Sequence, residues 1–176
     1  MNILQQMNPT ATVCFSGHRP ERLPGQGCRD KKASKTIISL LREKIVDAIA
    51  HDTNTFINGC MAGWDVLAAE QVVELKEEYP HIQLITIRPF ATGYFIRERC
   101  WTDEWIKRAW EIERRSDGLF IVSTHYQSGV YFQRNRMMVD HSAALICYWD
   151  GSNGGTAYTV RYAAKQHLAI CNLYSQ

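Results

Sequence analysis

The chain has no long apolar run and no strong excess of charge of either sign. No stretch approaches the roughly 18 apolar residues that a bilayer span requires, and residues 1–10 are polar without the apolar centre of a secretory signal. We therefore expect a cytoplasmic protein that is neither exported nor inserted into a membrane. With 20 basic and 18 acidic residues, the net charge is +2. This balance argues against nucleic acid as the partner, although it leaves room for local basic patches.

Several catalytic motifs are also missing. The chain has no Gly-x-x-x-x-Gly-Lys-Ser/Thr, no His-Glu-x-x-His and no Gly-x-Ser-x-Gly, which argues against a P-loop NTPase, a zinc protease and a serine hydrolase. Its six cysteines include no Cys-x-x-Cys pair and its six histidines are dispersed. We therefore expect no metal site and no disulfide framework. Several cysteines fall within apolar strand patterns, where a thiol packs as a small apolar side chain.

What the chain does have is a regular alternation of strand and helix patterns. Strand patterns lie at 12–16, 55–58, 82–88, 118–123, 143–149 and 168–174. Helix patterns lie at about 33–51, from Trp64 to before Pro80, and at 97–115, 133–141 and 157–167. This alternation predicts a Rossmann-like three-layer α/β sandwich, with a mostly parallel sheet of about six strands and helices on both faces. The length of 176 residues suits one core, so we expect a flexible segment at 1–10 and a single domain at 11–176.

The helix expected at 97–115 carries most of the tryptophans. An apolar stripe on one face contains Trp101, Trp105, Ala109 and Ile112. Base stacking on these rings is one interpretation, and core packing is the one favoured for the first two. Trp110 lies off the stripe and indicates a partner surface.

Three glycine-bearing turns follow strand patterns, where parallel sheets place ligand sites. The first is Ser16-Gly17-His18-Arg19-Pro20. Gly17 allows a sharp bend and a close approach to a ligand because it has no Cβ. Arg19 could bind a phosphate or carboxylate with two donors, and His18 could hydrogen-bond a base or a ribose. A solvated loop is the alternative for both residues.

The second turn is Gly59-Cys60-Met61-Ala62-Gly63-Trp64-Asp65. Gly59 ends a strand pattern and Gly63 precedes a helix, so several backbone N–H groups can face an anion. Asp65 has two interpretations, as a carboxylate that stabilises the first helical turn or as an acceptor for ribose hydroxyls. Glu70, on the same helix, is expected to face solvent rather than to act in catalysis, because nothing in the sequence places a second acid beside it.

The third turn, Gly154-Gly155-Thr156, follows a buried strand pattern and a flexible loop. Thr156 occupies the expected N-cap position, where its hydroxyl can cap the helix or contact a phosphate. A simple strand-to-helix turn is the alternative. Upstream, Arg134, Asn135 and Arg136 open the helix that leads into this strand. One side of that helix could face the same crevice, and a plain surface helix is the alternative.

Taken in order, these motifs resemble those of a known family. They read Cys14-Phe15-Ser16-Gly17-His18-Arg19-Pro20, Gly59-x-x-x-Gly63-x-Asp65 with Ala68-Ala69-Glu70, Arg134-Asn135-x-x-Met138-Val139-Asp140, and Tyr148-x-Asp150-Gly151 with Gly154-Gly155-Thr156. From about residue 12 onward the chain resembles the YpsA-like family of the SLOG superfamily, which is related to the DNA-processing protein DprA and to the LONELY GUY phosphoribohydrolases. The resemblance implies a Rossmann-like fold and a pocket for a nucleotide or a nucleotide derivative, including NAD or ADP-ribose derivatives.

The resemblance also implies which residues form the pocket. They are Gly17, His18, Arg19, Gly59, Gly63, Asp65, Arg134, Gly154, Gly155 and Thr156. Arg134 matches an arginine that the phosphoribohydrolases place near their substrate, but Thr159 stands where their Gly-Gly-x-Gly-Thr-x-x-Glu motif has its glutamate. Because a threonine hydroxyl is no acid at neutral pH, hydrolysis of an N-glycoside would need another group. Asp65 and Glu70 are the candidates.

Three functions are compatible with these features. We favour recognition of a nucleotide-like ligand without a required cofactor, in which Arg19 or Arg134 neutralises phosphate and Asp65 orients ribose hydroxyls. The alternatives are an N-glycoside hydrolase of a nucleotide-like substrate and a DprA-like single-strand binder, so the sequence leaves open whether the protein is an enzyme. The oligomeric states known in the superfamily, together with Trp110 as a candidate partner surface, favour a homodimer.

Overall fold

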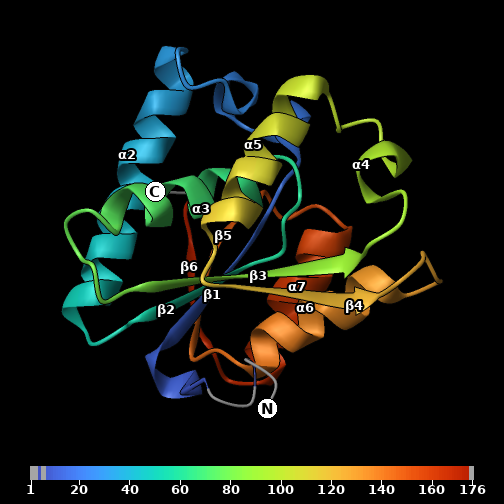
Figure 1. Cartoon of the computed structure of the whole chain (residues 1–176). Coiled ribbons are helices and arrows are strands. Elements are labelled where there is room, and N and C mark those ends of the chain that lie inside the picture. The colour runs from blue at the N-terminus through green and yellow to red at the C-terminus, as the bar shows by residue number, and fades with distance from the viewer. Residues whose placement is uncertain (1–3, 5–6, 175–176) are drawn as a thin grey trace.

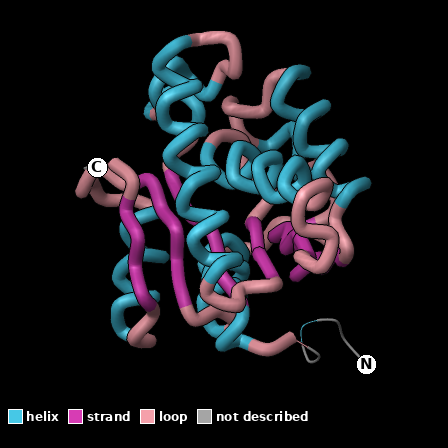
Figure 2. The backbone as a smooth tube through the Cα atoms, turned by 90° about the vertical axis from the view of Figure 1, so that its left-hand side faces the viewer, coloured by secondary structure: helices cyan, strands magenta, loops and turns pink. Residues whose placement is uncertain are grey.

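The computed structural model describes residue 4 and residues 7–174. A six-stranded sheet lies between two layers of helices (Figures 1 and 2), and all of its strand pairs are parallel. The strands are β1 Thr12–Gly17, β2 Thr55–Asn58, β3 Gln83–Phe90, β4 Gly118–Ser123, β5 Ala144–Tyr148 and β6 Ala169–Asn172. The expected Rossmann-like α/β sandwich is therefore confirmed. Within the segment expected to be flexible, residues 1–3 and 5–6 lie outside the described residues.

The order of the strands fixes where a ligand pocket belongs. The strands lie in the order β4-β3-β2-β1-β5-β6, so the chain moves outward from β1 to β4 and then crosses to β5 on the other side of β1. Within β1, Cys14 pairs with Ile57 of β2 and with Leu145 of β5. The crossing makes the carboxyl ends of β1 and β5 the switch point of the sheet, which is where open α/β sheets bind ligands.

Helices cover both faces of the sheet. They are α2 Lys32–Ala50, α3 Trp64–Leu75, α4 Tyr94–Arg97, α5 Asp103–Arg115, α6 Val130–Asp140 and α7 Gly155–Lys165, with short 3-10 helices η1 Pro9–Ala11, η2 Pro20–Arg22 and η3 Pro24–Gly27. On one face α3 packs against β1 and β2 between α2 and α5, and on the other α6 and α7 pack side by side (Figure 1). This sandwiched position buries almost all of α3, including Asp65.

The helix expected at 97–115 begins later than predicted. Thr102 caps α5, because its hydroxyl accepts a hydrogen bond from the backbone N–H of Trp105 at 3.4 Å. Trp101 therefore precedes the helix, although it is buried as expected, whereas Trp110 is 59% exposed. The exposure of the Trp110 ring does not by itself identify a partner, so the homodimer stays a prediction.

All six cysteines lie within the described residues, and Cys14, Cys28, Cys60, Cys100 and Cys147 are free thiols. Cys14 and Cys147 are buried in neighbouring strands, where they pack as small apolar side chains. Across the described part of the chain, no helix is both long enough and apolar enough to cross a membrane.

Candidate ligand pocket

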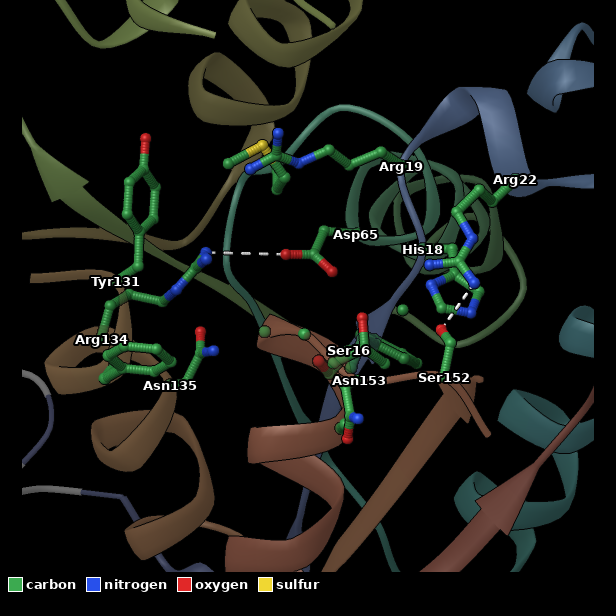
Figure 3. Close-up of a pocket in the computed structure, with 18 of the residues that line it drawn as sticks. Ser16, His18, Arg19, Arg22, Asp65, Tyr131, Arg134, Asn135, Ser152 and Asn153 are labelled. Carbon is green, nitrogen blue, oxygen red and sulfur yellow. Dashed lines mark hydrogen bonds and ion pairs between the residues drawn. The ribbon is translucent and has the colours of Figure 1, made fainter. Parts of the chain in front are cut away.

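A cavity of about 500 Å³ opens at the carboxyl ends of β1 and β5 (Figure 3). This volume falls within the range of about 300–1,000 Å³ that is usual for small-molecule sites. The walls come from the end of β1, the start of α3, the start of α6, and the loop that enters α7. Of the predicted pocket residues, those that line the cavity are Gly17, His18, Arg19, Asp65, Arg134, Gly154, Gly155 and Thr156. The cavity therefore lies at the switch point of the sheet.

The helices α6 and α7 both begin at this cavity after a glycine. Gly129 precedes α6 and Gly154 precedes α7, and neither cap position supplies a side-chain acceptor. The first N–H groups of these helices therefore have no side-chain partner at the cap, and the positive end of each helix dipole favours an anion there. Thr156, predicted as the N-cap of α7, is instead its second residue, because Gly154 adopts a φ of 147° that a larger residue disfavours.

Arg134 and Asp65 point toward each other across the cavity (Figure 3). Nη1 of Arg134 lies 3.6 Å from Oδ2 of Asp65, and the two residues are only 5% and 6% exposed. The same Nη1 donates a hydrogen bond to the carbonyl oxygen of Gly59. Nε of Arg134 is buried and has no hydrogen-bond partner among the described residues. Buried donors are normally satisfied, so this N–H lacks the acceptor that a ligand oxygen or a water molecule would supply.

Burial raises the pKa of Asp65 to about 6, although Arg134 and the backbone N–H groups of Met61 and Gly59 act in the opposite direction. The carboxyl group therefore takes up a proton just below neutral pH. Once it is protonated, the positive charge of Arg134 is no longer opposed.

We therefore expect the affinity for a nucleotide phosphodiester to rise as the pH falls from 7 to 5. Removing a negative charge roughly 4 Å from the phosphate corresponds to about 1 kcal/mol, or roughly fivefold in affinity, in a water-like dielectric. A phosphodiester is the suitable probe because a phosphate monoester itself titrates near pH ~6. Titration calorimetry at several pH values measures the effect, and Asp65→Asn should give a flat profile. A slope that persists in Asp65→Asn would assign the pH dependence to another group.

The turn after β1 is held by neighbouring loops rather than solvated. His18 is 6% exposed, and its Nε2 lies 2.9 Å from Oδ1 of Asp150 and 3.1 Å from the backbone nitrogen of the same residue. Burial also lowers the pKa of His18, which favours the neutral ring. Arg19 lies at the wall of the cavity, where its Nη1 donates to Oε2 of Glu98 at 3.0 Å. A phosphate on Arg19 would compete with that carboxylate.

Gly59 and Gly63 do not line the cavity but stand directly behind it. A Cβ at Gly59 would overlap Nη1 of Arg134, and a Cβ at Gly63 would overlap the backbone of His18 and Arg19. Gly63 also has a φ of +102°, a conformation that favours glycine. These glycines therefore allow the close packing that forms the cavity. A direct contact with a ligand stays a prediction for them, as for the lining residues.

Glu70 does not face solvent, so that expectation is wrong. Its side chain is 11% exposed, and Nε of Arg108 donates to its Oε1 at 2.7 Å. This ion pair joins α3 to α5. Because α5 covers α3 on that side, Glu70 is turned away from the cavity and is not among its lining residues. Asp65 is therefore the one of the two candidate acids that lines the cavity.

Thr159, which stands where the phosphoribohydrolase motif has its glutamate, links α7 to α6 by a hydrogen bond. It is 1% exposed, donates to the carbonyl oxygen of Gly155 at 3.0 Å, and accepts from Nδ2 of Asn135 at 2.8 Å. A buried hydroxyl in this role supplies no acid to the cavity.

An aromatic wall of the cavity was not predicted. It consists of Tyr126, Tyr131 and Phe132. The sequence pattern predicts a helix from residue 133, whereas α6 begins at Val130 after Gly129, whose φ is 81°. The signal that could have revealed the earlier start is the glycine directly before a run of large apolar residues, but a glycine in the cap position is a weaker signal than Ser, Asp or Asn.

A parallel sheet with a cavity at its switch point makes the chain a Rossmann-like α/β protein whose cavity lies where such folds bind ligands. The family model described as the YspA SLOG family matches residues 13–172. The chain therefore belongs to this family.

Similar proteins include members without a described activity. The uncharacterised SPbeta prophage-derived protein YoqJ of Bacillus subtilis is 30% identical over 64% of this chain and 71% of its own length. A UPF0398 protein of Brevibacillus brevis is 27% identical over 83% of this chain and 73% of its own length.

Among solved structures, the fold is similar to that of DNA processing protein A, DprA. The Streptococcus pneumoniae protein gives a TM-score of 0.59 at 12% identity, and the match covers 96% of this chain and 51% of that one. The Helicobacter pylori protein gives 0.60 at 19% identity, with 96% of this chain and 66% of that one covered. This chain thus spans about half of the first solved chain, and at such identities the likeness concerns the fold.

These neighbours correct the expectation that nucleic acid is not a partner. The structure of the Helicobacter pylori protein describes a single-stranded DNA binding mode, so a fold of this kind is compatible with nucleic acid. The expectation rested on the net charge of +2. A net charge sums the whole surface and does not show where unpaired cations gather.

Proposed function

We propose that the cavity binds the phosphate and sugar of a nucleotide, either free or at the end of a single strand. The observation that carries this proposal is the meeting of Arg134, with its unpartnered Nε, and the uncapped first turn of α7 in one cavity. A buried guanidinium and the N-terminus of a helix both favour phosphate oxygens.

Each wall suits one part of such a ligand. The N–H groups at Gly155 and Thr156, with Arg134, take the phosphate. A carboxyl oxygen of Asp65 accepts a hydrogen bond from a sugar hydroxyl in either protonation state. The aromatic wall, with Phe132 44% exposed, offers a flat apolar surface to the base. In this proposal recognition requires no cofactor and no metal, and the described residues include no group of three potential metal ligands.

A second candidate, hydrolysis of the N-glycosidic bond, is favoured by one observation. Asp65 lines the cavity with a pKa raised to about 6, so it can give up a proton near neutral pH. In such a reaction Asp65 would protonate the departing base as the bond to the sugar breaks, and the attacking water would return a proton to Asp65.

Native mass spectrometry with AMP, ADP-ribose, NAD and a 5′-phosphorylated deoxyoligonucleotide tests the proposal. We expect a complex of one ligand per chain with at least one of these compounds, and the absence of any complex would contradict the proposal. Following the same mixtures over time distinguishes the two candidates. An intact bound ligand indicates recognition, whereas release of free base that is lost in Asp65→Asn indicates hydrolysis.

A further inference from the structure

Two shallow hollows adjoin the cavity on the outer side of α6 and α7. One, of about 330 Å³, shares Asn153 and Gly154 with the cavity and continues along α7. The other, of about 420 Å³, shares Gly129 and Phe132 with it and continues along α6. The cavity therefore does not end at its rim but opens onto a surface formed by both helices.

Aromatic rings lie along this surface from the rim outward. The ring of Phe132 contacts that of Tyr158, with centroids 4.5 Å apart. Tyr162, one turn further along α7, holds its ring parallel to that of Tyr158, with an interplanar angle of 1° and centroids 6.3 Å apart. A row of partly exposed rings of this kind can stack nucleic-acid bases, because every base has a flat π face.

Positive charge accompanies the rings. The guanidinium of Arg136 lies 5.6 Å from the ring centroid of Tyr158 and 5.8 Å from that of Tyr162. Arg161 and Lys165, both exposed, line the hollow along α7. Among the described residues, no carboxylate forms an ion pair with any of these three cations.

The cavity and the surface around it differ in how their cations are paired. Within the cavity, Arg19, Arg22 and Arg134 each face a carboxylate. On the outer surface the nearby acid, Asp140, accepts a hydrogen bond from the hydroxyl of Tyr162 at 2.8 Å instead of pairing with a cation. Unpaired cations beside aromatic rings suit a phosphate backbone whose bases stack.

We propose that this surface binds the second nucleotide of a ligand whose first nucleotide occupies the cavity. We call it the α6–α7 strip, and it consists of Phe132, Arg136, Tyr158, Arg161, Tyr162 and Lys165. The inference rests on the proposed function of the cavity and specifies its ligand as a single-stranded oligonucleotide. Since Asn153 and Gly154 line both the cavity and the hollow along α7, the phosphodiester that joins the first two nucleotides passes over them.

The test compares pdA, pdA-pdA and a 5′-phosphorylated dA10 by titration calorimetry. We expect pdA-pdA to bind about tenfold more tightly than pdA, which is the gain of one stacked base. In the double variant Arg161→Gln/Lys165→Gln this advantage should be reduced but not abolished, because the rings remain, while pdA binds as before. The slope of log affinity for dA10 against log salt should fall by about 1.4, since each phosphate contact with a single strand contributes about 0.7.

A matched control makes the same change of charge elsewhere. Lys107 and Arg115 are exposed on α5 and form no ion pair within the described residues, so Lys107→Gln/Arg115→Gln should leave all three affinities unchanged. A second variant, Tyr162→Leu, removes a ring but keeps apolar volume, and should weaken dA10 but not pdA.

The outcomes separate the two proposals. If pdA binds and the longer ligands bind no more tightly, the strip is not a nucleotide site although the cavity is. If the strip and control variants weaken dA10 equally, the effect is one of total charge and the strip has no special role. If none of the ligands binds, the proposed function of the cavity itself is wrong.

Discussion

Replacing Arg134 by methionine is expected to weaken the binding of a nucleotide phosphate by about 100-fold, the upper part of the range for a hydrogen bond to a charged group. Arg134 provides the buried positive charge of the cavity and an unpartnered N–H. Methionine keeps an unbranched apolar stem in its place. Without Arg134 the pKa of Asp65 should rise further, so the carboxyl group stays protonated near neutral pH and no unpaired buried charge remains. Binding is measured by calorimetry, and folding by denaturant titration.

Arg108→Met is the matched control. Arg108 forms a comparable ion pair with Glu70 of α3, its side chain is 13% exposed, and it lies outside the cavity. This variant should lower the free energy of unfolding and leave binding unchanged. If Arg134→Met binds as tightly as Arg108→Met, the phosphate does not contact Arg134 and the proposed orientation of the ligand is wrong.

The sequence predicted the position of the cavity because the signals involved are local. An apolar strand followed by a glycine turn is visible in the chain, and a parallel sheet brings all such turns to one edge. Gly17 at the end of β1 pairs in register with Tyr148 at the end of β5, so the first and third turns meet. The predicted strands agree with the observed ones to within two residues at each end.

The pairing inside the cavity could not be predicted in the same way. Arg134 meets Asp65 because α6 and α3 approach from opposite faces of the sheet, at a place where Gly59 leaves room. Nothing local connects those positions. Glu70 shows the same limit of prediction from local sequence. Helical periodicity indicates the side of α3 on which Glu70 lies, but it does not show that Arg108 of α5 lies opposite.

The start of α5 is a boundary that the sequence does signal. Thr102 is followed by two acidic residues, Asp103 and Glu104, which together form a typical start signal for a helix. The apolar spacing of the tryptophans instead predicts a helix that includes Trp101. Trp101 is nevertheless buried, because it packs against Tyr94 with ring centroids 5.3 Å apart. The burial of Trp101 was thus predicted correctly, but the contact with Tyr94 that buries it was not predicted.

Gly17→Ala is expected to have the largest effect on stability, lowering the free energy of unfolding by about 2–3 kcal/mol, as overpacking of a core does. The added methyl group would overlap the side chain of Trp64 at Cβ and Cγ. Trp64 cannot easily withdraw, because it is 1% exposed and its Nε1 donates to the carbonyl oxygen of Ile146 at 3.3 Å. Its backbone N–H also donates to the carbonyl oxygen of His18 at 3.0 Å. Urea titration measures the loss.

Gly155→Ala makes the same chemical change, but we expect it to weaken ligand binding and not stability. Its Cβ would meet no atom within 4 Å, and alanine gains up to about 1 kcal/mol over glycine in a helix. Stability should therefore be kept or raised, while the methyl group at the first turn of α7 obstructs the place proposed for the phosphate. If Gly17→Ala unfolds at the wild-type urea concentration, the contact with Trp64 does not fix the turn. If Gly155→Ala binds normally, the phosphate does not lie within contact distance of the Cβ at position 155.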